Sequence, residues 1–206
     1  MFAGAAAVMQ AVESQTLILY HTDLRGQWPE EGARALTRRL PYGKRLGLGS
    51  GAHAQASLAG VALALRALAR LTGRRVQPDE LRFVPDAKPE LVTTGAPGCD
   101  FSIAHSGPFV GCAALRGGQV GFDVEVGAGA RLGEWVAREA VVKACGAGVR
   151  ALAEVQLRDG GACCRGRAWY ARTLGHFPGA AACVMTSSQL QGIEAQAVPL
   201  AELFVT

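Results

Sequence analysis

The stretch VGFDVEV, residues 120–126, alternates apolar and other side chains in the way that is typical of a short strand. Residues two apart in a strand share a face, so Asp123 and Glu125 project together, opposite the apolar side chains of Phe122 and Val124. Two carboxylates held side by side raise each other's pKa and cost stability. The pair therefore predicts a positive group nearby; without one it would be only a solvated edge.

The sequence after this strand predicts a helix over residues 133–148, GEWVAREAVVKACGAG. Glu139 and Lys143 are four positions apart and so share one face of that helix. Alone, such a pair is most often a solvated salt bridge that contributes a few tenths of a kcal/mol. Here the expected apolar side of the helix consists of Trp135, Val136, Ala140 and Val141. Glu139 and Lys143 then lie at the border of that apolar side.

About ten residues separate Glu125 from this helix, so the strand and the helix must lie close together. Three carboxylates, Asp123, Glu125 and Glu139, would then converge. Oxygen ligands of this kind suit Mg²⁺, which commonly recruits substrate phosphates as further ligands. Lys143 lies one turn from the third acid and is placed to meet those phosphates. The pattern predicts a magnesium–phosphate site.

The rest of the chain suggests two related halves. A core helix is expected over 57–73, with Ser57 as its cap and Gly73 at its end, and the segment between residues 21 and 51 is expected to be polar and irregular. In each half a core helix ends at a glycine and a strand follows eight or nine residues later. Further strands are expected at 16–20, 81–84, 101–106, 109–115, 154–161, 168–174 and 181–188. The prediction is an α+β fold of two similar halves, 1–105 and 106–206, related by a pseudo-twofold axis, each a small antiparallel sheet packed on a core helix, with an active cleft between them.

Composition excludes several classes of protein. Among 206 residues, 50% are hydrophobic and 18% are charged, which indicates a globular chain. The net charge of +4 comes without a concentrated basic stripe, so no nucleic-acid partner is expected. The longest apolar run, 58–65, is too short to span a bilayer, and the amino terminus lacks the basic region of a signal peptide. Six cysteines show no metal-ligand spacing, and we expect a soluble, cytoplasmic protein.

Three lysines stand against eighteen arginines: Lys44, Lys88 and Lys143. Arginine can replace lysine wherever only a surface charge is needed, so the lysines that persist suggest a need for a compact ammonium group. His105 follows a strand at the head of a turn. It is either a structural residue or, together with the backbone N–H groups of Ser106 and Gly107, part of an anion site.

Three blocks in this order, FSIAHSG (101–107), VGFDVEV (120–126) and WVAREAVVKACG (135–146), together resemble the signature blocks of 4′-phosphopantetheinyl transferases. The similarity is to the longer, pseudo-dimeric class that activates surfactin synthetase. The segments DAKP (86–89) and SLAGVALALRAL (57–68) also resemble elements of that class, and the similarity extends over roughly residues 40–188.

The resemblance implies an enzyme that transfers the phosphopantetheine arm of coenzyme A to a serine of an acyl or peptidyl carrier protein, releasing adenosine 3′,5′-bisphosphate. It implies roles in fatty-acid, polyketide or nonribosomal peptide biosynthesis. Asp123, Glu125 and Glu139 would hold Mg²⁺, and Asp123, Glu139 and Lys143 would be catalytic. Coenzyme A phosphates would be contacted by Lys44, Ser57, Lys88, His105 and Lys143.

The sequence departs from that class at several places. Ala104 replaces a hydroxyl residue, Ala87 replaces a glycine, Arg138 replaces a lysine, and the linker from Glu125 to Trp135 is short. The alternative is therefore a degenerate relative that binds coenzyme A or a carrier protein without catalysis. An unrelated Mg²⁺-dependent phosphate-ester enzyme would require the ordered blocks to be a coincidence. Because an internal duplication lets one chain build the whole cleft, a monomer is expected.

Overall fold

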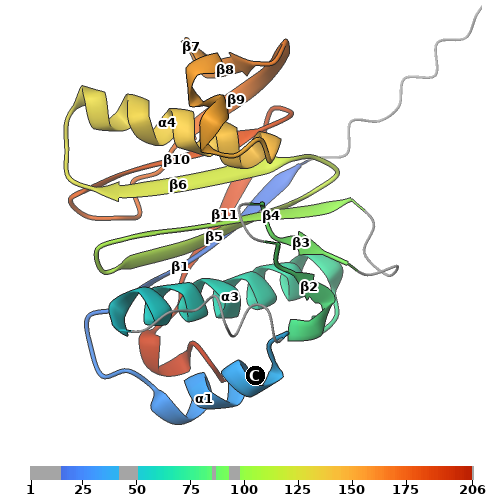
Figure 1. Ribbon diagram of the computed structural model, residues 1–206, viewed down its shortest axis with the longest axis vertical. Coiled ribbons are helices and arrows are strands. Elements are labelled where there is room, and N and C mark those ends of the chain that lie inside the picture. The colour runs from blue at the N-terminus through green and yellow to red at the C-terminus, as the bar shows by residue number, and fades with distance from the viewer. Residues whose placement is uncertain (1–14, 42–50, 85–86, 93–97, 206) are drawn as a thin grey trace, which may run out of the picture.

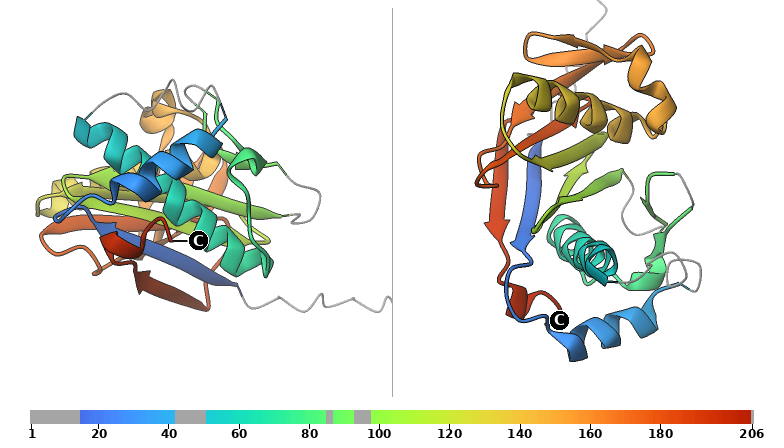
Figure 2. Two further views of the ribbon diagram at one scale, coloured as in Figure 1. Left: turned by 90° about the horizontal axis from the view of Figure 1, so that it is seen from below. Right: turned by 60° about the vertical axis from the view of Figure 1, so that its left-hand side comes forward.

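The computed structural model describes residues 15–41, 51–84, 87–92 and 98–205, which form a layered α+β fold (Figure 1). Two sheets lie between two long helices, α3 (Gly51–Thr72) and α4 (Ala130–Cys145). Each helix covers the outer face of one sheet, and a third helix, α1 (Glu30–Arg39), lies outside α3 (Figure 2). The expected α+β class, with one core helix on each sheet, is confirmed.

The first sheet has the strand order β11-β1-β5-β4. Its strands are β1 (Thr16–Asp23), β4 (Cys99–Ser106), β5 (Phe109–Arg116) and β11 (Gly192–Ala197). β1 pairs antiparallel with β5 but parallel with β11, so the expectation of a purely antiparallel sheet is wrong for this half. The parallel pair arises because the chain crosses over from the second sheet to reach the free edge of β1. Two of the four strands, β5 and β11, lie beyond residue 105, so the sheets do not divide at the expected boundary.

The second sheet is antiparallel throughout, with the order β6-β10-β9-β8-β7. Its strands are β6 (Val120–Val126), β7 (Gln156–Arg158), β8 (Gly161–Cys164), β9 (Arg167–Thr173) and β10 (Ala180–Thr186). A separate pair joins β2 (Leu81–Arg82) to β3 (Glu90–Leu91). Three short 3₁₀ helices complete the elements: η1 (Pro78–Glu80), η2 (Val149–Glu154) and η3 (Leu200–Glu202).

Both core helices end as the sequence predicts, at glycines with positive φ: 68° at Gly73 and 64° at Gly146. Glycine has no Cβ and adopts this left-handed conformation without strain. The start of α3 differs from the expectation, because the helix begins at Gly51 and Ser57 lies inside it instead of capping it. α1 occupies part of the segment that was expected to be irregular, and it buries Ala33 and Leu36.

Buried apolar side chains form three clusters, one between each pair of adjacent layers. In β1, Ile18 and Tyr20 face α3, whereas Leu17 and Leu19 face the second sheet. This alternation lets one strand serve two cores, because successive side chains point to opposite faces. Among the described residues α3 alone is long and apolar enough to cross a membrane, but it packs on the first sheet as a core helix. The arrangement is compatible with a soluble domain.

Candidate functional site

The candidate site lies where α4 crosses β6, and Gly121 permits the close approach of these two elements. A Cβ atom at Gly121 would overlap the carbonyl oxygen of Ala140 and the amide nitrogen of Ala144. The residue must therefore be glycine for the helix to lie this close to the strand. Asp123, two positions along β6, shares this face, and it lies under the side of α4 that carries Lys143.

Asp123 and Lys143 form an ion pair at the centre of the site. The Nζ atom of Lys143 donates a hydrogen bond of 2.6 Å to Oδ1 of Asp123. Asp123 is only 4% exposed, and its second oxygen, Oδ2, is buried without a hydrogen-bond partner among the residues that the structure describes. A buried carboxylate oxygen without a partner is costly, so this atom marks a place where another positive group or donor would be favourable.

The electrostatic environment of Asp123 reflects the neighbouring acids. Burial raises the pKa of the Asp123 carboxyl from its ordinary value of 3.8 to about 6, Lys143 opposes this change, and the charges of Glu125 and Glu139 add to it. Glu125 and Glu139 therefore both lie within electrostatic range of Asp123. The positive group that the acid pair predicts is the ammonium of Lys143, which contacts Asp123.

Glu125 is tied to the first sheet of the molecule. Its Oε2 atom accepts a hydrogen bond of 2.7 Å from the hydroxyl of Ser106, at the end of β4. The same hydroxyl oxygen accepts a bond of 3.1 Å from the backbone N–H of Val126. Ser106 thus holds the Glu125 carboxylate at the junction between the two sheets, beside His105.

The donor set suits Mg²⁺ by its chemistry, since Asp123, Glu125 and Glu139 supply only oxygen atoms and Oδ2 of Asp123 has no partner. With the side chains as they stand, no group of three His, Cys, Asp or Glu within the described ranges has the geometry of a metal site. Lys143 instead neutralises Asp123. Holding a cation would require the acids to turn toward one another.

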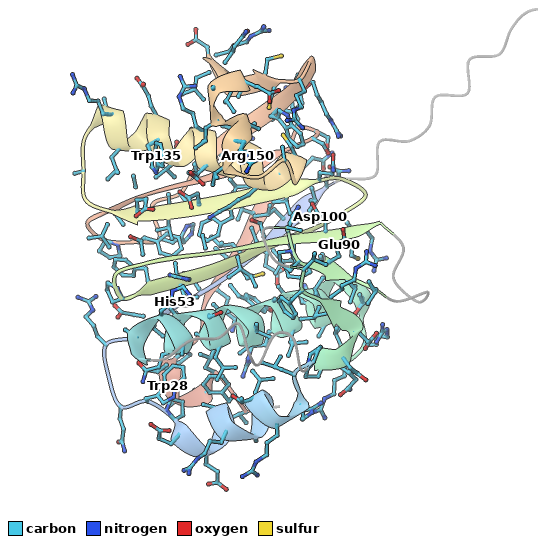
Figure 3. All side chains as sticks on the ribbon, in the orientation of Figure 1. Trp28, His53, Glu90, Asp100, Trp135 and Arg150 are labelled. Carbon is cyan, nitrogen blue, oxygen red and sulfur yellow. The ribbon has the colours of Figure 1, made fainter. Side chains whose placement is uncertain are left out.

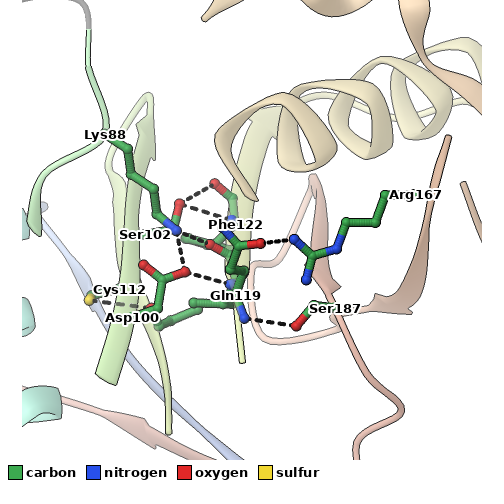
Figure 4. A network of polar contacts seen from close by, with 10 residues as sticks. Lys88, Asp100, Ser102, Cys112, Gln119, Phe122, Arg167 and Ser187 are labelled. Carbon is green, nitrogen blue, oxygen red and sulfur yellow. Dashed lines mark hydrogen bonds and ion pairs between the residues drawn. The ribbon is translucent and has the colours of Figure 1, made fainter. Parts of the chain in front are cut away.

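A cavity of about 220 Å³ lies beside Glu139, between β4, α4 and the segment before β3; Asp123 and Glu125 are not among the residues that line it. Glu139, Lys143 and Lys88 line it together. Lys88, however, is bound within the protein: its ammonium forms an ion pair with Asp100 and donates a bond of 2.6 Å to the carbonyl of Val120 (Figure 4). Burial lowers the pKa of Lys88, although Asp100 opposes that change.

Side chains of β4 bridge to the backbone of β6, as Figure 4 shows for two of them. The N–H groups of Val120 and Phe122 donate to Asp100 (2.7 Å) and to the hydroxyl of Ser102 (3.0 Å), and Ser106 bonds Val126 further along. Each bridge joins residue n of β4 to residue n + 20 of β6. Residue 104 is the remaining position of this alternating row (100, 102, 104 and 106). It is an alanine, so its side chain accepts no hydrogen bond from the backbone N–H of Val124. The alternating sequence DFSIAHS (100–106) carries this signal, which the sequence analysis did not interpret.

His105 lies against a second histidine that the sequence analysis missed. The rings of His105 and His53 are 5.3 Å apart and nearly perpendicular. His53 belongs to the first turn of α3 (Figure 3), so this pair joins the start of the first core helix to the end of β4. Ser57 lies one turn further along the same helix, whereas Lys44 falls outside the described residues.

Trp135 does not pack in the core. It is 46% exposed on α4 (Figure 3), so the expectation that it belongs to the apolar side of the helix is wrong, whereas Val136, Ala140 and Val141 are buried there as expected. Trp135 lies one turn before Glu139 and two turns before Lys143. These three side chains therefore follow the border between the buried and the exposed face of α4. Only residues 127–129 connect β6 to α4.

Comparison with known proteins does not identify the chain: no protein-family model matches it, and no curated protein shows significant similarity to it. The chemistry of the site therefore depends on its own geometry. That geometry places three carboxylates, an ammonium group and a cavity at the junction of two sheets. Oxygen ligands beside an ammonium group have the chemistry that suits a cation together with a phosphate.

Proposed function

We propose that the protein is a 4′-phosphopantetheinyl transferase, which moves the phosphopantetheine arm of coenzyme A to a serine hydroxyl of a carrier protein and releases adenosine 3′,5′-bisphosphate. The observation that carries this proposal is the convergence of Asp123, Glu125, Glu139 and Lys143 where α4 crosses β6. These residues belong to the sequence blocks that resemble the family, and two of them, Glu139 and Lys143, line a cavity between the two halves.

In this proposal the three acids would hold Mg²⁺, which supplies polarisation of the reacting phosphoryl group and neutralises the leaving bisphosphate. Lys143, which is now paired with Asp123, would turn to a pyrophosphate oxygen once a cation lies between the acids. Glu139 lines the cavity and is placed to accept the proton of the attacking serine hydroxyl. Binding and positioning then account for most of the rate, as in other phosphoryl transfers.

The alternative is a relative that binds coenzyme A or a carrier protein without catalysis. Two observations favour it. The connection of residues 127–129 leaves no room for the insert that helps to receive the carrier in the family. In addition, the ammonium of Lys88 already contacts the carboxylate of Asp100 and the carbonyl of Val120, although Lys88 also lines the cavity.

The decisive experiment is intact-protein mass spectrometry of apo carrier proteins incubated with the protein, coenzyme A and Mg²⁺. We expect a mass gain of one phosphopantetheine arm, which is lost in EDTA and with Glu139→Gln. Glu134→Gln is the matched control, because Glu134 is exposed on the same helix and should leave the gain unchanged. A folded protein that binds coenzyme A but modifies no carrier would instead support the non-catalytic relative.

A further inference from the structure

A larger cavity lies far from the acids, on the outer side of α3. Its volume is about 550 Å³, within the range of about 300–1,000 Å³ that is typical of small-molecule sites. Residues of α1, α3 and η1 and residues 203–205 line it. The proposed transfer reaction does not use this region, because α4 and the acids lie at the opposite end of the molecule.

The inner wall of this cavity is apolar. Leu36 of α1, Ala62 and Leu65 of α3, and Phe204 near the carboxyl end contribute to it. Phe204 also stacks edge-on against Trp28, with ring centroids 5.3 Å apart. Phe204 can pack here because residue 32 is a glycine. A Cβ atom at Gly32 would lie only 2.6 Å from the Cβ atom of Phe204. The wall is therefore shaped by close packing between distant parts of the chain.

The charge on the rim is of one sign. Four arginines line the cavity, and no aspartate or glutamate is among its lining residues. Arg66 donates to the backbone carbonyls of residues 202, 203 and 205, and Arg70 is paired with Glu194. These two arginines hold the wall in place.

The other two arginines, Arg39 and Arg75, line the cavity and are related through Gln77. Arg39 donates to the side chain of Gln77, and Arg75 is two residues before Gln77. Arg75 is exposed, and its guanidinium has no acceptor within the part of the chain that the structure describes. Guanidinium groups bind carboxylates in a forked, bidentate geometry. The cavity beside these arginines is therefore complementary to a carboxylate.

We propose that the cavity binds a small amphipathic anion: a single carboxylate on an unbranched apolar tail of medium length. The carboxylate would lie at Arg39 and Arg75, and the tail along Leu36, Leu65 and Phe204. A purely apolar ligand would leave these arginines unused, and a highly charged one would leave the apolar wall uncovered.

The test uses dodecanoate, titrated by calorimetry at low salt and below its aggregation concentration. We expect saturable binding with one ligand per chain. Dodecyltrimethylammonium has the same tail and the opposite charge, so it should bind about tenfold more weakly or not at all. Equal binding of the two ligands, or no saturable binding of dodecanoate, would overturn the proposal.

Two pairs of variants locate the ligand. Ala69→Leu fills the cavity and should abolish binding, whereas Ala130→Leu, at an exposed position of α4, should retain it. Arg75→Gln should weaken dodecanoate binding about tenfold, whereas Arg158→Gln, an exposed arginine on β7, should not. Thermal melts check that each variant is folded. Binding that survives Ala69→Leu in folded protein would overturn the assignment, as would light scattering that shows a second copy of the chain blocking the ligand.

Discussion

Two lysine–aspartate pairs lie near the same junction, and they differ in how completely they are satisfied. Lys88 and Asp100 each have a second partner in the backbone of Val120, whose carbonyl accepts from the lysine and whose N–H donates to the aspartate. Within the described part of the chain, the side chains of Lys143 and Asp123 are hydrogen-bonded only to each other, and Oδ2 of Asp123 is buried without a partner there. The lysine side chains are 13% and 32% exposed, respectively.

This difference separates a fully hydrogen-bonded pair from one that keeps an unsatisfied oxygen. A buried ion pair whose remaining atoms are satisfied fixes geometry, and removing one member is costly. A buried carboxylate that lacks a partner and lies beside two further acids carries unfavourable energy that a ligand can relieve. The first pair joins β4 to β6 through Val120, and the second is the one on which the proposed function rests.

The largest effect is expected from Asp123→Asn. If the acids hold Mg²⁺ for transfer, this change should lower the rate at least about a thousandfold, equivalent to about 4 kcal/mol. It should not lower the melting temperature, because it removes a buried charge with an unsatisfied oxygen. A carrier-modification assay and a thermal melt measure the two effects. A variant with full activity would show that Asp123 is not part of the catalytic site.

Asp100→Asn should show the opposite pattern and destabilise the fold. It leaves Lys88 buried without its counter-charge, which we expect to lower the free energy of unfolding by about 3–4 kcal/mol in urea titrations. The double variant Lys88→Met, Asp100→Leu removes both charges and should recover much of the loss. A loss below about 1 kcal/mol in the single variant would contradict the structural role.

The stability of the fold should depend on pH through the carboxyl group of Asp123. In metal-free protein the folded state holds the Asp123 proton more tightly than the unfolded chain, because the folded pKa is about 6 and the ordinary value is 3.8. The contribution of Asp123 to stability is therefore fully present below pH about 4 and is lost as the pH rises to about 6, a total of about 3 kcal/mol.

The difference in unfolding free energy between the wild type and Asp123→Asn isolates this contribution from other titrating groups. The variant should gain stability relative to the wild type as the pH rises through that window. At pH about 7.5, millimolar Mg²⁺ should raise the melting temperature of the wild type but not that of the variant. A difference that is independent of pH would contradict the raised pKa.

The smallest effect is expected at the gap in the row of bridges from β4 to β6. Ala104→Ser places a hydroxyl opposite the backbone of Val124 and should stabilise the fold by roughly 0.5–1.5 kcal/mol. Ser106→Ala removes an existing bridge and should cost a similar amount. Urea titrations of both variants provide the measurement. A destabilising Ala104→Ser would show that the space beside β6 is too small for a hydroxyl.

The sequence predicts the neighbourhood of Asp123 well because the signals there are local. The alternation of residues 120–126 matches β6 at both ends, and the helix spacing that places Glu139 beside Lys143 depends only on positions four apart. The burial of Asp123 against α4 follows from Gly121, whose role becomes visible only when the helix and the strand are seen in contact.

Contacts between distant segments could not be predicted in the same way. Composition suggested that the three lysines need a compact ammonium group, and the family resemblance implied that they meet phosphate. The partners of Lys88 instead come from β4 and β6, and no local pattern selects them. β11 is partly exposed at the edge of its sheet and lacks apolar alternation, so its sequence GIEAQA gives no strand signal. The start of α3 at Gly51 was missed because Ser57 is a plausible cap in sequence.

The parallel pairing of β1 with β11 has a consequence for biosynthesis. β1 leaves the ribosome before its outer neighbour β11, which is made about 170 residues later. Until then one edge of β1 exposes unpaired backbone groups, which is a template for aggregation. A chain truncated before residue 192 would keep every acid of the candidate site and still leave the first sheet open. We therefore expect such a truncation to reduce solubility and recruit chaperones during synthesis, even though it removes no residue that touches the acids.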